Sequence, residues 1–393
     1  MAALLGATAV GAGAIGTGAP GPADADDGQT SIDDAGSEAG GTSTADADSD
    51  DTDDDPESDD VERGDATETL VVRFEPHGSG AGVGAQADDG PPSIDELKDH
   101  AETSKEPFRQ AFGGNDAVGA QDTDAAAVTI KREFWLANAA LVEVDTDRVP
   151  ESKLLETPGV ERVHENFAVE IDSTAASGAS GEGSGSMTSA SVSTDSNEFT
   201  YGLGMINVPA AWDRFDEGTE PGAGATVAVL DTGVDDGHED LTVDEWVEFN
   251  FLGNEIQDSE PNDENGHGTH VAGTVAGSSD PAGGGDRYGV APGASLYGVK
   301  VLDDDGSGSF AQVIAGMEWA TERDEVDVLQ LSLGSEGTED EFIEPVRNAR
   351  DDGKIVVASV GNDGSGSSSS PGNVYEAFPV GAVDSDEAVA DFS

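Results

Sequence analysis

The carboxyl-terminal half of the chain, residues 197–393, predicts an α/β fold with a mainly parallel sheet and flanking helices. Two observations carry this prediction: apolar runs that are continuous rather than alternating, as in buried parallel strands, and amphipathic helical stretches between them. The strand-like runs are residues 225–231, 295–302, 326–332, 354–360 and 378–383. In an open parallel sheet, functional groups gather at the carboxyl ends of the strands. We therefore expect a site along that rim.

Three helical stretches are expected between these strands. Residues 309–322 place apolar side chains at i, i+3, i+4 and i+7, the spacing of one helix face. Residues 339–351 also collect apolar side chains on one side, and Pro345 must lie in the first turns of that helix or bend it. A glycine-rich loop leads into a third helix, expected from Thr269 to Ala276.

Residues 66–172 predict a small α+β domain. Strand patterns alternate with helical ones in the order β, α, β, α, β, which is typical of such a domain. The expected elements are a strand at 70–74, a helix that begins at Ile94, a strand at 140–145, a helix at 149–155 and a last strand at 160–169.

The chain is strongly acidic. It has 17 lysines and arginines against 83 aspartates and glutamates, a formal net charge of −66, so nucleic acid and anionic membranes are poor candidate partners. Acid also fills the segments expected to fold, and such self-repulsion is tolerable at high salt, where the Debye length falls to about 3 Å at 1 M. We expect a salt-adapted protein; an ordinary acidic protein with a charged tail is the alternative. The absence of cysteine excludes disulfides, thiolate chemistry and cysteine zinc sites.

Three segments are expected to lie outside any packed domain. Residues 1–25 are a signal-like segment whose apolar run, residues 2–16, is too short to span a bilayer, and the segment is similar to a secretory signal with Ala23-Asp-Ala25 as its cleavage site. No arginine or lysine precedes that segment, so the signal is atypical or the start falls inside a longer leader. Residues 26–65 are acidic and predicted to be disordered, and the Ser/Gly-rich residues 173–196 have the composition of a linker. We expect a secreted, extracellular protein without a membrane anchor after processing.

Three polar residues are placed at the expected rim. Asp231 ends a strand-like run, His267 stands where the glycine-rich loop meets its helix, and Asn362 follows another run. An aspartate that orients an imidazole, an imidazole that takes a proton and an amide that holds an oxyanion are three parts of a serine acyl-transfer site. The sequence therefore predicts hydrolytic chemistry at this rim.

Each of these residues has a simpler interpretation. Asp231 could cap a helix, and Asn362 could be only a turn residue. His270 follows His267 by three positions, where it is expected to face the packed side of the helix. A zinc site at the two histidines is disfavoured, because zincins place them at i and i+4 with an intervening glutamate.

Four motifs together resemble the subtilisin-like serine peptidases, the subtilase family. They are Val229-Leu-Asp-Thr-Gly-Val234, His267-Gly-Thr-His-Val-Ala-Gly273, Leu331-Ser-Leu-Gly334 and Gly361-Asn362, and the resemblance runs from about Tyr201 to Ser393. The acidity is similar to that of the halolysins of salt-loving archaea. The resemblance implies that Asp231 orients the imidazole, His267 is the general base and Asn362 is the oxyanion donor. Residues 66–172 are similar to the family's propeptide, a folding assistant and inhibitor whose tail lies in the substrate cleft before it is cut away.

The resemblance also implies how substrate and metal would bind. An extended polypeptide would lie between two chain edges, formed by Ser332, Leu333 and Gly334 on one side and by Gly306, Ser307 and Gly308 on the other. Asp240 matches a calcium ligand of the family, whereas the loop at residues 278–288, with Asp280 and Asp286, differs from it. We expect no cofactor for catalysis, a structural calcium at Asp240, and a monomer whose partners are polypeptide substrates and its own propeptide in cis.

The family's nucleophile does not occur in its expected setting. That serine lies in Gly-Thr-Ser-Met-Ala downstream of the asparagine, and no such motif follows Asn362; the only Gly-Thr-Ser is Gly41-Thr42-Ser43, in the acidic segment. We expect a secreted serine endopeptidase precursor that is truncated before the catalytic serine and inactive in this form. The alternative is a non-catalytic secreted binding or inhibitor protein with a decayed peptidase half-domain. A decayed site, however, has no chemical reason to keep Asp231, His267 and Asn362 together.

Overall fold

The computed structural model describes residues 67–78, 91–113, 127–171 and 199–393, which all belong to one compact unit of the chain. Below, the described residues up to 171 are called the N-terminal region, and residues 199–393 the C-terminal region. The segments predicted at 1–25, 26–65 and 173–196 lie outside the described residues.

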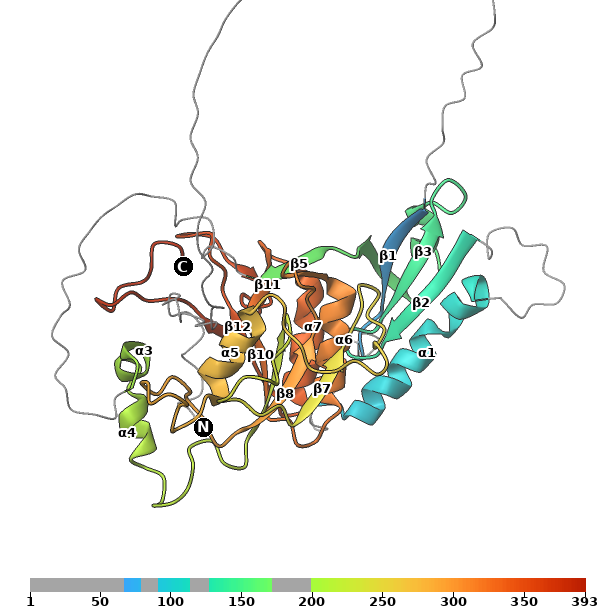
Figure 1. Ribbon diagram of the computed structural model, residues 1–393. Helices are drawn as coiled ribbons and strands as arrows, with labels where there is room; N and C mark the ends of the chain where they lie inside the picture. The colour runs from blue at the N-terminus through green and yellow to red at the C-terminus, as the bar shows by residue number, and fades with distance from the viewer. Residues whose placement is uncertain (1–66, 79–90, 114–126, 172–198) are drawn as a thin grey trace, which may run out of the picture. The chain divides into compact units, whose positions relative to one another are not determined.

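The N-terminal region is a four-stranded antiparallel sheet with a long helix on one face (Figure 1). The strands stand in the order β2-β3-β1-β4, and α1 packs on them through Phe108 and Phe112. A capping box between Ser93 and Glu96 fixes the start of α1. The elements are β1 (Thr67–Phe74), α1 (Ile94–Phe112), β2 (Val128–Phe134), β3 (Ala139–Asp145), α2 (Glu151–Leu155) and β4 (Val160–Glu165).

Two predictions for this region were wrong in detail. The strand β2 was not predicted, because four of its seven residues are polar and its middle is only half-buried. The predicted strand at 160–169 is two strands, β4 and β5 (Ala168–Ile171). The strand is interrupted at Asn166 and Phe167, and β5 pairs with strands of a different sheet. The order of elements in the sheet region is therefore β, α, β, β, α, β.

The C-terminal region contains a six-stranded parallel sheet, which confirms the predicted α/β fold class. Its strand order is β14-β12-β10-β6-β8-β7, and every neighbouring pair is parallel. All five predicted strands are present; β7 was missed because it is a short, partly exposed edge strand with two glutamates. The strands are β6 (Thr226–Asp231), β7 (Glu245–Glu248), β8 (Ser295–Lys300), β10 (Val328–Leu331), β12 (Ile355–Ser359) and β14 (Phe378–Val380).

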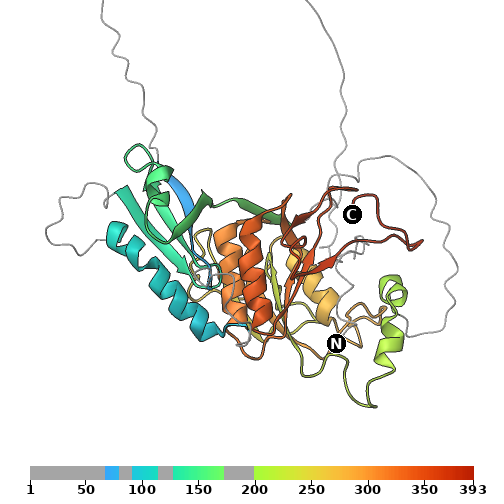
Figure 2. The ribbon, with the colours of Figure 1, turned by 180° about the vertical axis from the view of Figure 1, so that it is seen from behind.

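Helices cover both faces of this sheet. On one face α5 (His267–Ala276) packs through Val271 and Val275 on apolar side chains of β6 and β8. On the other face lie α6 (Phe310–Thr321) and α7 (Ile343–Asp351), in front of the sheet in Figure 2. The short helix η2 (Asp340–Phe342) leads into α7, whose first turn contains Pro345 as predicted. Two further short helices, α3 (Tyr201–Met205) and α4 (Val208–Trp212), precede β6.

A small third sheet joins the two regions. Its order is β13-β11-β5-β9, so β5 of the N-terminal region lies between two strands of the C-terminal region. These strands are β9 (Ser307–Ser309), β11 (Leu333–Glu336) and β13 (Ser369–Ser370). Within the described ranges, no helix is long and apolar enough to cross a membrane.

Candidate functional site

Asp231 is the last residue of β6 and lies at the carboxyl end of the sheet, completely buried. The strand ends here because Gly233, two residues on, has a positive φ of 124°. A Cβ at Gly233 would lie 2.0 Å from the carbonyl oxygen of Asn262, so only glycine fits at this turn. The backbone N–H of Thr232 donates to Asp231 Oδ1 over 2.7 Å, which fixes the carboxylate at the rim.

His267 is the first residue of α5 and contacts Asp231 directly. Its Nδ1 lies 2.7 Å from Asp231 Oδ1, and its side chain is 27% exposed where that of Asp231 is 0%. A carboxylate accepts only, so the neutral imidazole carries its proton on Nδ1 and leaves Nε2 as the basic nitrogen. This pair can therefore take a proton from a hydroxyl group at the Nε2 side.

The predicted oxyanion donor lies on the same side of the sheet. Asn362 follows β12, and the sheet order β12-β10-β6 places its loop two strands from Asp231 at the carboxyl end. Ser332 follows β10, the strand between them. The three strand ends thus bring Asp231, Ser332 and Asn362 to one rim, and α5 brings His267 to it.

The two predicted substrate edges overlap the strands β11 and β9, and a third strand, β5, lies between these strands. Ala168–Ile171 runs antiparallel to both β9 and β11. Val169 lies opposite Gly308, Glu170 lies opposite Gly334, and Ile171 donates its N–H to the carbonyl of Gly306 over 2.9 Å. An extended segment between two strand edges is the arrangement by which peptidases and other peptide-binding proteins hold polypeptides.

Apolar contacts anchor this extended segment. Val169 is fully buried in the same core cluster as Leu333 and Phe310, and Phe167 stacks against Phe310 with ring centroids 5.1 Å apart. The side chain of Ile171 lies against Gly306. A Cβ added at Gly306 would come within 2.8 Å of Ile171 Cδ1. Main-chain pairing therefore sets the register of this segment, and alternate apolar side chains hold it in place.

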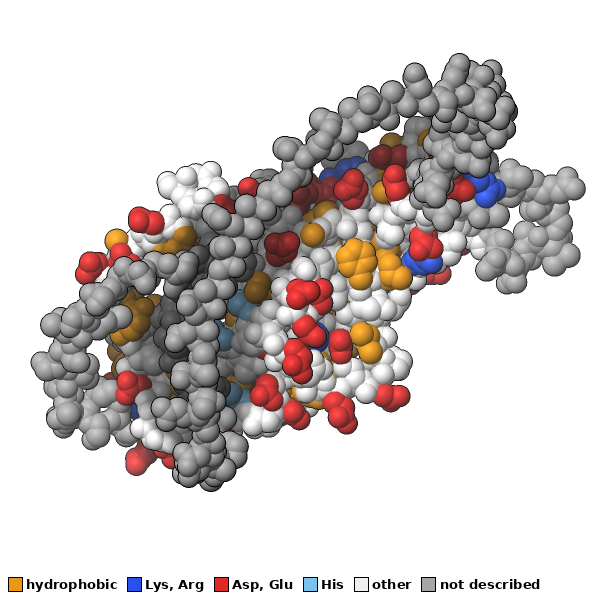
Figure 3. Space-filling view, turned by 45° about the horizontal axis from the view of Figure 1, so that its top comes forward, with side chains coloured by type: hydrophobic (Ala, Val, Ile, Leu, Met, Phe, Trp, Pro, Cys, Tyr) orange, Lys and Arg blue, Asp and Glu red, His pale blue; other side chains and the backbone are white. Residues whose placement is uncertain are grey.

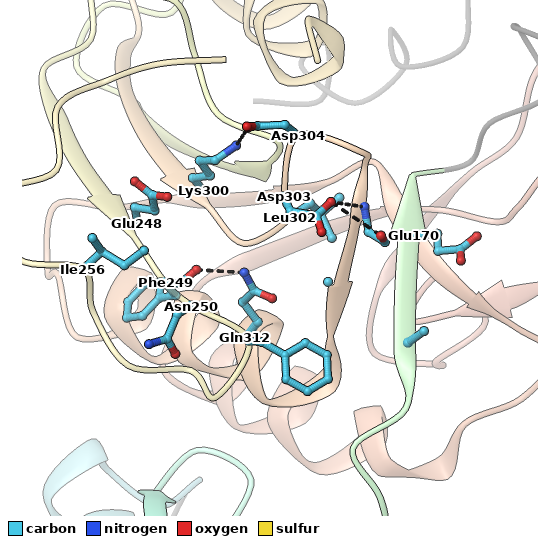
Figure 4. A pocket seen from close by; sticks show the side chains of 14 residues that line it. Glu170, Glu248, Phe249, Asn250, Ile256, Lys300, Leu302, Asp303, Asp304 and Gln312 are labelled. Carbon is cyan, nitrogen blue, oxygen red and sulfur yellow. Dashed lines mark hydrogen bonds and ion pairs between the residues drawn. The ribbon is translucent and has the colours of Figure 1, made fainter. Parts of the chain in front are cut away.

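Below, the space between β9 and β11, which β5 fills, is called the groove. A cavity of about 410 Å³ borders this groove beside β5 and β9. Figure 4 shows Lys300 paired with Asp304 on one side of this cavity and Gln312 bonded to the carbonyl of Phe249 on the other. Glu170 and Glu248 also line it, so carboxylates dominate its charged wall. On the face of the molecule shown in Figure 3, acidic side chains are spread over the described surface, and lysine and arginine are scarce.

Comparison with known proteins agrees with this geometry. Residues 222–393 match the family model described as "Subtilase family". Subtilisin DY of Bacillus licheniformis is 38% identical over 197 residues, which cover 49% of this chain and 67% of that protein. The chain belongs to the subtilase family. Subtilisin Savinase of Lederbergia lenta is 40% identical over 195 residues (49% of this chain, 66% of that protein), and an alkaline protease of Shouchella clausii is 40% identical over 206 residues (52% of this chain, 50% of that protein). The chain thus spans about half the length of that alkaline protease.

The calcium ligand expected in this subtilase is occupied by hydrogen bonds. Asp240 Oδ2 accepts from the Tyr288 hydroxyl over 2.7 Å, and Asp240 Oδ1 accepts from the N–H of Ala282 over 2.7 Å. Burial, and then the contact with Asp240, raise the pKa of the Tyr288 phenol. In the part of the chain that the structure describes, no three His, Asp or Glu side chains gather as a metal site requires. Calcium takes six to eight oxygen ligands, so the described residues around Asp240 do not fit it as they stand.

The prediction for His270 was wrong, and two other site residues were missed. His270 is exposed, because Val271 and Ala272 form the packed face of α5. Thr232 and Asp263, which the sequence analysis did not assign, link the chain around Asp231 to the start of α5. Asp263 lies six residues before the predicted helix start at Thr269, and the N-cap of α5 is Gly266, so the capping rules do not single out this aspartate.

Proposed function

We propose that the protein is the precursor of a secreted serine endopeptidase, which hydrolyses peptide bonds through an Asp-His-Ser triad. One observation carries this proposal: the 2.7 Å contact between His267 Nδ1 and the buried Asp231 Oδ1, at the rim where a groove holds an extended chain segment. Membership of the subtilase family supports it.

The proposed reaction assigns one task to each group. His267 Nε2 takes the proton of a serine hydroxyl while the serine oxygen attacks the peptide carbonyl carbon. Asp231 holds the imidazole in the reactive tautomer and stabilises the imidazolium that forms, and the side-chain amide of Asn362 donates to the oxyanion. The proton then passes from His267 to the leaving amine, and water cleaves the acyl-enzyme by the same route in reverse.

We propose that the nucleophile is a serine outside these 393 residues. The proposal rests on sequence, since no Gly-Thr-Ser-Met-Ala motif follows Asn362 in the chain. It implies that a polypeptide of these residues alone lacks peptidase activity, whereas a product that contains the motif has it. The rival hypothesis is a non-catalytic secreted protein with a decayed half-domain.

The N-terminal region is proposed to be a propeptide that inhibits in cis. Its strand β5 fills the space between β9 and β11, so a polypeptide substrate can enter only when β5 leaves. Removal requires a cut after Ile171, and we propose that it lies in the Ser/Gly-rich residues 173–196. The mature enzyme is proposed to be a salt-adapted extracellular monomer. A structural calcium at Asp240 stays a prediction, and the ion would have to replace the Tyr288 and Ala282 donors.

Sequencing of the gene beyond codon 393, followed by expression of the encoded product, tests this function. We expect a Gly-Thr-Ser motif downstream and hydrolysis of a protein substrate such as casein in molar KCl. His267→Ala and Asp231→Asn should abolish hydrolysis, while His77→Ala, at an exposed histidine of the N-terminal region, should leave it unchanged. A stop codon directly after codon 393 would support the non-catalytic rival, and so would a complete triad that cleaves nothing.

A further inference from the structure

A ring of hydrogen bonds, closed through the backbone between Gly268 and Thr269, lies next to the Asp231–His267 pair. It connects the turn after β6 with the loop and first turn of α5, and its central members are Asp263 and Thr232. Neither residue belongs to the proposed triad. Together they join the backbone on both sides of His267 to the backbone next to Asp231.

The carboxylate of Asp263 accepts four hydrogen bonds. Its Oδ1 accepts from the N–H of Gly266 over 2.9 Å and from the hydroxyl of Thr232 over 2.8 Å. Its Oδ2 accepts from the N–H of Thr269 over 2.7 Å and from the Thr269 hydroxyl over 2.6 Å. A helix cap needs only one such contact. Here the contacts bracket His267, one residue before it and two residues after it, and the fourth crosses to the strand that ends in Asp231.

Thr232 completes the ring from the other side. Its backbone N–H donates to Asp231 Oδ1, its hydroxyl donates to Asp263, and the same hydroxyl accepts from the N–H of Gly268 over 2.9 Å. Lys300 Nζ donates to the carbonyl oxygen of Thr232, so the residue is held at three of its polar groups. Thr232 is completely buried, which protects these contacts from exchange with water.

The orientation of Asp231 depends on this ring. Only its Oδ1 is bonded, to the N–H of Thr232 and to His267 Nδ1, since Oδ2 is buried without a hydrogen-bond partner among the described residues. The two backbones approach so closely that a Cβ at Gly268 would lie 2.1 Å from the carbonyl oxygen of Gly233. A small shift of α5 relative to β6 would therefore change the distance between the carboxylate and the imidazole directly.

We propose that Asp263 and Thr232 are positioning residues, which hold the imidazole of His267 against Asp231 in the tautomer with the proton on Nδ1. This inference builds on the proposed function, because it assigns the means by which the general base is prepared. It requires neither a nucleophile nor a substrate. It can therefore be tested on the 393-residue chain itself.

The test measures the Nδ1–H proton of His267 by NMR on the 393-residue chain with 15N-labelled histidine. The chain has six histidines, and His267→Ala assigns the resonance. In Asp263→Ala and Thr232→Val we expect this proton to exchange with water at least about tenfold faster, or its resonance to vanish, because the imidazole is no longer held against the carboxylate. Thr232→Ser, which keeps the hydroxyl, should restore the parent behaviour. Glu264→Gln removes one negative charge from an exposed neighbour of Asp263 and should change nothing.

Circular dichroism and the melting temperature separate positioning from misfolding. The proposal is supported if Thr232→Val keeps the parent fold and loses the protected proton while Thr232→Ser retains it. It is overturned if folded Thr232→Val and folded Asp263→Ala both keep the proton with the parent exchange rate. If Asp263→Ala fails to fold, the Thr232 pair decides alone. Absence of peptidase activity in a longer product would refute the proposed function without affecting this result.

Discussion

Glu318 of α6 offers a direct test of how the N-terminal region is held in place. Its Oε1 accepts the backbone N–H of Leu136 over 2.9 Å and also that of Trp135, both in the turn between β2 and β3. Arg132 Nη2 lies 3.7 Å from Oε2. Burial dominates over these partners and raises the pKa of Glu318 from 4.5 to about 7.

The sign of the pH effect follows from this raised pKa. Between pH 4.5 and about 7 the folded chain keeps a proton that the unfolded chain has released. The contribution of Glu318 to stability is therefore complete below pH 4.5 and is lost as the pH rises through about 7. A shift of about 7 − 4.5, or roughly 2.5 units at 1.36 kcal/mol each, amounts to about 3 kcal/mol. Glu318→Gln, which stays neutral, should lack this loss.

The assay is urea unfolding at pH 5 and at pH 8, followed by the fluorescence of the four tryptophans. Molar KCl in the buffer screens the exposed acids but not this buried one. We expect Glu318→Gln to gain about 2 to 3 kcal/mol on the parent between pH 5 and pH 8, a little less than the full shift because the window begins at pH 5, where part of the loss that starts near pH 4.5 has already occurred. Glu217→Gln, at an exposed glutamate, should run parallel to the parent. The reasoning would be refuted if the free energy of unfolding changed equally with pH in Glu318→Gln and in the parent.

Three further predictions concern other buried groups. Burial lowers the pKa of His164 from 6.5 to about 4, so its contribution to stability is present above pH 6.5 and lost as the pH falls through about 4. In urea unfolding, His164→Phe should reduce the free energy lost between pH 7 and pH 4 by about 3 kcal/mol. An unchanged loss would contradict this prediction. Arg73 is 1% exposed and pairs with Glu344 over 2.8 Å. Arg73→Met should therefore lower the free energy of unfolding by about 3 to 5 kcal/mol in the same assay. A loss below about 1 kcal/mol would show that the buried carboxylate finds another partner. Tyr288→Phe removes a donor from Asp240 and should cost about 1 to 3 kcal/mol in the same assay, and an unchanged free energy of unfolding would contradict this. The calcium predicted at Asp240 would show as a fall in the parent's melting temperature on adding EGTA.

The fold class could be predicted because buried parallel strands leave a strong pattern. The apolar runs that became β6, β8, β10, β12 and β14 are continuous, and only a two-sided sheet buries such runs. The strands that were missed have short or mixed patterns: β7 is an edge strand, and Ser307–Ser309 has no apolar residue. Those strands are specified by pairing partners distant in sequence, which local patterns do not record.

The position of β5 shows the same limit at the functional site. The sequence at 160–169 reads as one strand, because Phe167 continues its apolar pattern. The break occurs where Val169 leaves the N-terminal sheet to pair with β9 and to fill a space beside Phe310. Asp231 and His267 were found from their motifs, whereas Asp263 became visible only from the contacts that surround it.

The central claim is that His267, oriented by Asp231, activates a serine at the rim of the groove. The most direct measurement is the rate at which a fluorophosphonate probe labels the product that carries the downstream Gly-Thr-Ser, compared with its His267→Ala variant. We predict labelling of that serine at a rate at least about a hundredfold higher in the parent, the size of a general-base contribution. Equal rates in the two proteins, or no labelling of a folded parent freed of its N-terminal region, would contradict the account.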